Sequence, residues 1–186
     1  MARAATVVLD HDDMRRTLVR IAHEIVEKNP DRPIALVGIH RRGAILAQRV
    51  HALTSELLAA DVPLGDIDIS FYRDDFAFRP SAPVVHASHL DFQLEDRTIV
   101  IVDDVLYTGR TVRAAIDAIF DYGRPARVQL AVMVDRGHRE LPIRPDYVGK
   151  NIPTSQDQRV NVRVEEIDGV DEVTISPARE PERRAA

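Results

Sequence analysis

The sequence predicts an α/β fold: a central, mainly parallel sheet flanked by helices, with a small hood. Short apolar runs, typical of buried strands, alternate along the chain with segments whose apolar residues recur at helical spacing. Strands that alternate with helices in this way form parallel sheets covered on both faces. A chain of 186 residues that is 45% hydrophobic can bury the core of one such domain. We expect a single domain over residues 1–178 and a disordered, charged tail over 179–186.

The N-terminal half is predicted to contain a short first strand, two long helices and two further strands. One apolar face, repeated at Met14, Leu18 and Ile21, and acids at its start predict the first helix. An uninterrupted apolar run predicts the second strand, because a strand buried on both faces has no polar positions. Alternation of apolar and polar residues predicts the third strand. These elements are expected at 6–9, 10–29, 34–39, 42–60 and 66–72, with a hairpin or mobile loop over 73–92.

The C-terminal half begins with the most apolar strand of the chain, followed by a helix that Gly123 and Pro125 end. One more strand follows this helix, and the segment after Val134 is expected to form the hood, with a late pair of strands. These elements are expected at 98–102, 108–122, 127–134, 160–164 and 173–176.

Composition excludes several classes of function. The chain has no cysteine, so disulfides, thiolate metal sites and thiol catalysis are excluded. A net charge of -5 means that any nucleic acid must bind a local basic patch rather than a global field. The N-terminus lacks the apolar region of a signal peptide and no apolar run is long enough for a membrane span. We therefore expect a cytoplasmic protein with no membrane contact.

The strongest functional signal is a buried strand that ends in Asp103 and Asp104 and leads through a short loop into a helix. Ligands of open α/β sheets bind at the carboxyl ends of strands, and N–H groups at a helix N-terminus favour a phosphate. Gly109 permits close approach to that phosphate, and Thr108 and Thr111 add hydroxyl groups. Two acids beside a phosphate would repel it unless something separates them. A pentose can do so, because its hydroxyls can donate to the carboxylates while its phosphate lies on the loop. The acids would also stabilise positive charge on the ribose ring in the transition state.

This string closely resembles the diphosphoribosyl-binding motif of type I phosphoribosyltransferases. Residues 36–43, 68–75 and 134–151 further resemble one branch, the bifunctional pyrimidine operon attenuation regulators with uracil phosphoribosyltransferase activity. The resemblance covers roughly residues 7–170. It implies the transfer of phosphoribose from 5-phosphoribosyl-1-diphosphate to uracil, giving uridine monophosphate and pyrophosphate. A Mg²⁺ ion carried with the diphosphate is implied as well, rather than a metal site built only from side chains.

The resemblance assigns most of the substrate site. Asp103, Asp104 and Arg42 are the expected catalytic residues, and Arg42 can bind a diphosphate in bidentate fashion. The family usually has Thr where this chain has Arg41, so this extra cation could tighten diphosphate binding or reach RNA. The whole set expected to bind 5-phosphoribosyl-1-diphosphate is Arg41, Arg42, Arg73, Asp103, Asp104, Val105, Leu106, Tyr107, Thr108, Gly109, Arg110 and Thr111.

Position 107 indicates the base. Purine enzymes of this fold usually carry Asp there, three residues after the second acid, whereas this chain has Tyr107. Backbone groups near Asp135, Arg136 and Val148 could complement uracil, and Tyr147 resembles the aromatic that stacks on the base in related transferases. A core tyrosine is the alternative role for position 147.

A second function, binding of a stem-loop in pyrimidine-operon messenger RNA, is implied by the same branch. Its members bind that RNA through a basic face of a dimer, with uridine nucleotides such as UMP and UTP as signals in the phosphoribosyl site. Val19 stands where relatives can carry a polar residue. A homodimer or larger homo-oligomer is expected, and the residues expected to contact RNA are Arg16, Arg20, His23, His138, Arg139, Arg144 and Lys150.

Three other functions are weighed against this interpretation. One is an RNA-binding regulator with weak or vestigial enzyme activity, and another is a purine or xanthine phosphoribosyltransferase, which Tyr107 disfavours. The third is a receiver-like signalling domain, which needs acids on separate strands and a late Lys that this pattern does not supply.

Overall fold

A computed structural model describes residues 5–70, 72 and 88–177. The predicted contacts of Arg73 and the predicted tail over 179–186 lie outside the described residues. Among the residues described, none of the helices combines the length and the apolar composition that crossing a membrane requires. In chain order the elements are β1 (Thr6–Leu9), α1 (His11–Lys28), β2 (Ile34–Ile39), α2 (Arg42–Leu58), β3 (Leu64–Ile67), β4 (Thr98–Leu106), α3 (Arg110–Tyr122), β5 (Arg127–Asp135), β6 (Tyr147–Asn151), β7 (Gln158–Arg163), α4 (Glu165–Asp168) and β8 (Glu172–Pro177).

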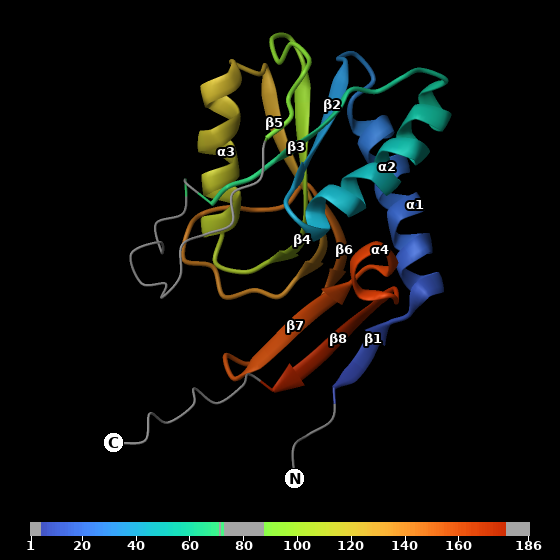
Figure 1. Ribbon diagram of the computed structural model, residues 1–186, viewed down its shortest axis with the longest axis vertical. Coiled ribbons are helices and arrows are strands. Elements are labelled where there is room, and N and C mark those ends of the chain that lie inside the picture. Colours follow the sequence, from blue (N-terminus) through green and yellow to red (C-terminus); the bar gives the residue numbers. More distant parts are fainter. Residues whose placement is uncertain (1–4, 71, 73–87, 178–186) are drawn as a thin grey trace.

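The central sheet has five parallel strands in the order β3-β2-β4-β5-β6. Helices α1 and α2 cover one face of this sheet and α3 covers the other (Figure 1). Alternate residues of β4 therefore enter two separate cores: Val100 packs with α1 and α2, whereas Ile99 and Ile101 pack with α3. The predicted fold class is confirmed.

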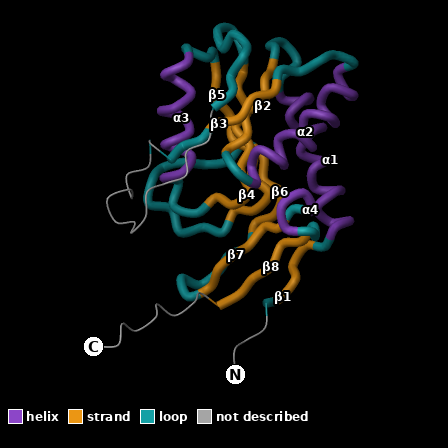
Figure 2. Tube along the Cα trace, viewed as in Figure 1, coloured by secondary structure: helices purple, strands orange, loops and turns teal. Residues whose placement is uncertain are grey.

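A second sheet forms the hood, which we define as β1, β7, α4 and β8. Its strands are antiparallel in the order β1-β8-β7, so the first strand of the chain pairs with the last (Figure 2). Val160, Val162 and Val173 of the hood share the core of α1 and α2, which fixes the hood on that side of the central sheet.

Several expected boundaries differ from the structure. The strand expected at 98–102 is β4, which continues to Leu106 and therefore includes Asp103 and Asp104. The strand expected at 66–72 is β3 and ends at Ile67, where the side chains of Asp68 and Ser70 begin a turn. The helix expected from 108 starts at Arg110, because Gly109 at its N-cap has φ +95°. The segment after Val134 does not all join the hood: β6 extends the central sheet, and β1 completes the hood instead.

Candidate active site

The loop between β4 and α3 forms the first part of the site. Gly109 turns the chain into α3 through left-handed backbone, which glycine adopts without steric cost. The carbonyl of Thr108 accepts hydrogen bonds from the N–H groups of Glu140 and Leu141 at 3.0 and 3.1 Å, so a distant segment braces the loop. A cavity of about 280 Å³ is lined by Asp103, Val105 to Val112 and Glu140. Its position at a helix N-terminus suits a phosphate group.

The paired acids lie where β4 approaches α2. Asp103 is 6% exposed, and its carboxylate accepts the N–H of Asp104 at 2.9 Å. The carboxylate of Asp104 accepts the N–H of Val105 at 2.7 Å. A Cβ at Gly43 would lie 2.6 Å from the carbonyl oxygen of Val102, so only glycine lets the start of α2 come this close. Burial raises the pKa of Asp104, while the positive charge of Arg42 acts in the opposite direction.

The loop from β2 into α2 supplies Arg42 as the first residue of the helix. Its guanidinium forms a bidentate ion pair with Asp168 of the hood, at 3.0 Å from Nε and 2.7 Å from Nη2. His40, after the last residue of β2, pairs with Asp66 of the neighbouring strand at 2.6 Å. Arg41 is exposed and caps α2 through backbone alone. This loop is thus held to both β3 and the hood.

A second cavity of about 380 Å³ opens between this loop and the hood. Arg42, Asp104 and Asp168 line it, and the other wall is the outward-facing side of β7, with Arg159, Asn161 and Arg163. Asp103 lines the first cavity and Asp104 the second, so the paired acids stand between the two. The β7 wall was not predicted, because alternating polar residues on a strand are ordinarily a solvated face.

Tyr107 lies at the rim of the first cavity on a rigid support. The guanidinium of Arg136 sits 4.1 Å from the centre of its ring, and the His138 ring meets it edge-on at 5.9 Å. Arg136 is 7% exposed and donates to Thr154 at 3.1 Å and to the carbonyl of Gln158 at 2.9 Å. Arg136 therefore supports the ring of Tyr107 through its side chain.

The prediction that Tyr147 stacks on the base is wrong for this structure. Tyr147 is fully buried in the core shared with α1, on the face of the sheet opposite to α3. Its hydroxyl lies 2.9 Å from Gln129 and 3.1 Å from Asn29. The next residue, Val148, faces the other core, and its carbonyl accepts from Arg20 at 3.0 Å. Tyr147 therefore has the alternative role considered for it, that of a core tyrosine.

The residues expected to contact RNA divide into two groups. Arg139 donates to the carbonyls of Tyr107 and Ile143 and forms an ion pair with Asp135 at 2.5 Å, and its side chain is 23% exposed. Arg139 therefore supports the active-site loops, and its contact with RNA stays a prediction. His138 is similarly engaged, at 2.6 Å from the carbonyl of Thr154.

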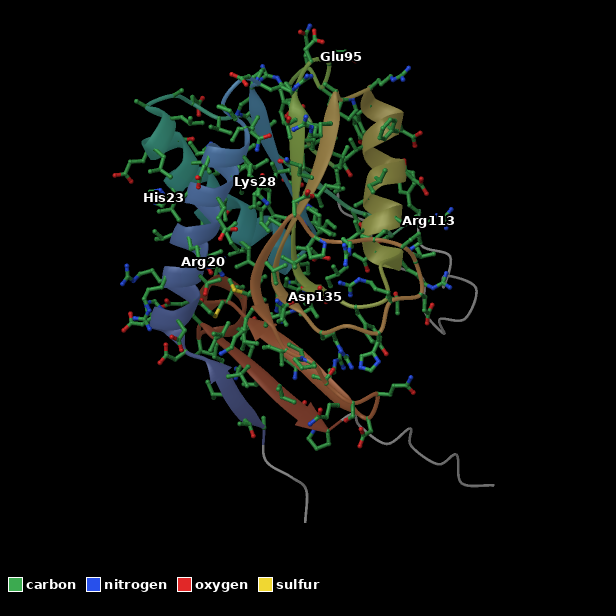
Figure 3. The ribbon with its side chains drawn as sticks, turned by 180° about the vertical axis from the view of Figure 1, so that it is seen from behind. Arg20, His23, Lys28, Glu95, Arg113 and Asp135 are labelled. Carbon is green, nitrogen blue, oxygen red and sulfur yellow. The ribbon has the colours of Figure 1, made fainter. Side chains whose placement is uncertain are left out.

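Of the other RNA candidates, three lie on α1 and two on the segment 144–150. Arg20 reaches from α1 to the carbonyls of Val148 and Gly149, which joins that helix to the segment 144–150. Figure 3 shows Arg20, His23 and Lys28 along α1. Much of this charge is paired locally, since Arg16 binds Asp13 and Arg20 binds Glu24, each at 2.7 Å. Lys150 donates to the carbonyl of Val8 at 3.3 Å, and Arg144 is exposed.

Comparisons with known proteins agree on one family. The model of the phosphoribosyl transferase domain matches residues 5–167. The bifunctional protein PyrR of Roseiflexus sp. is 60% identical over 170 residues, covering 90% of this chain and 93% of the relative. PyrR of Chloroflexus aurantiacus is 57% identical over 169 residues, covering 90% and 93%. The crystal structure of the hypoxanthine phosphoribosyltransferase of Trypanosoma cruzi shares the fold, with a TM-score of 0.70, 17% identity and coverage of 94% and 98%.

Proposed function

The chain belongs to the phosphoribosyl transferase domain family, in the branch of bifunctional PyrR proteins, and we propose that it transfers phosphoribose to uracil. The paired acids between two cavities are the observation that carries this proposal. The 5-phosphate would occupy the cavity at the start of α3, where the backbone N–H groups of the loop favour an anion. The diphosphate would occupy the cavity beside Arg42, on the other side of Asp103 and Asp104.

In the reaction, N1 of uracil forms a bond to C1 of the ribose as the bond from C1 to the diphosphate oxygen breaks. Pyrophosphate leaves with the electron pair of the broken bond, and the N1 proton of uracil passes to solvent. Asp103 and Asp104 hold the ribose hydroxyls and stabilise the positive charge that develops on the ring. Arg42 stabilises the negative charge that develops on the leaving diphosphate. A general base is not required where uracil reacts as its anion.

A magnesium ion fits this arrangement. The carboxylate of Asp104, which lines the proposed diphosphate cavity, and that of the adjacent Asp103 are oxygen ligands of the kind that Mg²⁺ prefers, and substrate oxygens and water would fill the remaining positions. When bound, the ion neutralises charge that develops on the leaving group. Asp103 and Asp104 are the residues that would hold it.

Tyr107 supports uracil over purines, because an aromatic ring fixed by Arg136 stands where purine enzymes of this fold usually carry an acid. Uracil, hypoxanthine and guanine in competition for limiting 5-phosphoribosyl-1-diphosphate and Mg²⁺ test the choice of base. We expect uridine monophosphate as the dominant product. A dominant purine nucleotide would overturn the assignment of the base while leaving the transferase in place.

The second proposed function is nucleotide-dependent binding of pyrimidine-operon messenger RNA. The observation that favours it is the contact of α1 with residues 148–150, where Arg20 binds the backbone of that segment and the charge of Lys150 acts on Asp13 of the helix. Because Arg139 is engaged in the active-site loops, we assign the RNA contacts first to Arg20, His23, Arg144 and Lys150. We propose that a homodimer or larger homo-oligomer presents these residues. Its nucleotide substrates and RNA partner favour a cytoplasmic location.

A further inference from the structure

Two arginines of α2 join it to the hood through three ion pairs: Arg42 with Asp168, and Arg49 with both Asp171 and Glu166. Arg42 and Arg49 lie seven residues apart, on one face of the helix. Arg42 binds Asp168, and Arg49 binds Asp171 through Nη1 at 2.9 Å and Nη2 at 2.8 Å. Both pairs are bidentate, but only the first lines the cavity beside Asp104. The structure thus contains one arginine paired at the cavity and a second arginine, bound by two acids of the hood, two turns further along.

The pair at the cavity fixes the direction of Arg42. Asp168 occupies the Nε–Nη2 edge of the guanidinium. The third nitrogen, Nη1, has no hydrogen-bond partner among the described residues, so this group remains for a ligand. Asp168 is itself held in place, because its Oδ2 accepts the N–H of Val164 at 2.9 Å and its side chain is 14% exposed. The hydrogen bond from Arg42 lowers the pKa of Asp168, so the carboxylate is charged at neutral pH.

The direction of the Arg42 side chain matters because of Asp104. It is the other acid that lines the cavity, and its charge acts on Arg42. Without Asp168, the strongest attraction on Arg42 inside the cavity would come from Asp104. A pair between these two residues would withdraw the cation from the diphosphate and the carboxylate from the ribose.

We propose that Asp168 is a positioning residue for the diphosphate, which holds Arg42 away from Asp104 and leaves Nη1 for a phosphate oxygen. The inference rests on the proposed function, since it takes Arg42 as a diphosphate ligand. It assigns the hood a part in binding the leaving group, through a residue 126 positions from Arg42.

Steady-state kinetics and calorimetry on purified, folded variants test this. In Asp168→Asn the amide keeps an oxygen for the N–H of Val164 but loses the charge that holds Arg42. We expect the KM for 5-phosphoribosyl-1-diphosphate to rise about tenfold, equivalent to about 1.4 kcal/mol. The KM for uracil should change much less. Calorimetric affinity for inorganic pyrophosphate with Mg²⁺ should fall by a similar factor, and Asp168→Glu should recover part of the loss.

Asp171→Asn is the control, because it removes one of the two hood acids that bind Arg49, on the same helix but away from the cavity. We expect it to lower the melting temperature without raising the KM for 5-phosphoribosyl-1-diphosphate. A double-mutant cycle with Arg42→Gln then separates positioning from general damage. If Asp168 acts through Arg42, Asp168→Asn has little further effect once Arg42 is replaced.

Each outcome bears on one proposal. Equal effects of Asp168→Asn with and without Arg42, or unchanged pyrophosphate affinity in Asp168→Asn, would overturn the positioning role. A wild-type protein that binds neither pyrophosphate nor 5-phosphoribosyl-1-diphosphate would instead overturn the proposed transferase.

Discussion

Replacing Asp104 by Asn separates catalysis from stability. The amide has nearly the same shape as the carboxylate, and its oxygen can still accept the N–H of Val105, which now lies 2.7 Å from Asp104. The fold is therefore expected to persist. What is lost is a negative charge fixed between the two cavities, where positive charge develops on the ribose.

The substitution is expected to lower the catalytic rate but not the stability of the fold. Removal of one preorganised electrostatic contact raises the activation barrier by about 2.7–4 kcal/mol, which lowers kcat by about 10²–10³-fold. Stability changes the other way. Burial raises the pKa of Asp104, so the folded state disfavours its anion, and stability is lost as the pH rises through the folded-state pKa. A neutral side chain removes this cost, although it also gives up the attraction of Arg42. We expect an equal or higher melting temperature at neutral pH.

Two measurements on the same preparation check this prediction: kcat with uracil, 5-phosphoribosyl-1-diphosphate and Mg²⁺, and thermal unfolding followed by circular dichroism. Low activity together with a lowered melting temperature would mean that Asp104 supports the fold rather than the reaction. Activity near that of wild type in a folded variant would remove Asp104 from the site altogether.

Four further predictions concern stability and RNA binding. Tyr147→Phe should lower stability by about 1 kcal/mol through lost hydrogen bonds, while the KM for uracil stays unchanged; a large rise in that KM would return Tyr147 to the base site. Arg144→Gln or Lys150→Gln should weaken binding of the cognate leader RNA and flatten its salt dependence by about 0.7–0.9 per phosphate contact. UMP should strengthen wild-type RNA binding, and filter binding with an unrelated stem-loop showing equal affinity would refute both. Asp171→Asn should cost about 1.5 kcal/mol at pH 7, the scale of a charged hydrogen bond, because Arg49 keeps its pair with Glu166. Burial opposes the charge of Asp171, but hydrogen bonds from Arg49 lower its pKa overall, so unfolding measured from pH 7 to pH 2 should show this difference vanish as acid protonates the wild-type residue.

The parts of the site that lie within one stretch of sequence could be predicted. A buried strand, two acids, a glycine turn and a helix start follow one another from 98 to 111, and each has a local physical signature. The direction of β4 then places the acids and the loop at one edge of the sheet, with no information from elsewhere in the chain. The core faces of α1 and β2 were equally local, because the 3.6-residue and continuous apolar patterns are visible in the sequence.

Other features depend on contacts between distant segments. Tyr147 was misassigned because consecutive strand residues face opposite sides, and the sequence around β6 does not reveal which side holds the ligand. Arg139 reads as a surface cation until Asp135 and the carbonyls of Tyr107 and Ile143 are seen around it. The β7 wall has the alternation of a half-solvated strand, and only the hood's position shows that its outer face borders a cavity.

The charges around Asp104 explain why this site needs a hood at all. A cation for the diphosphate must come close to the paired acids, since the diphosphate leaves from the ribose that they hold. At that distance the cation and the acids attract one another, and the empty site would tend to close on itself. A second acid paired with Arg42 balances this attraction, and here an element outside the central sheet supplies it. Asp168 is that acid, and its ion pair with Arg42 also fastens the hood to α2. The same contact therefore stabilises the hood and holds Arg42 away from Asp104.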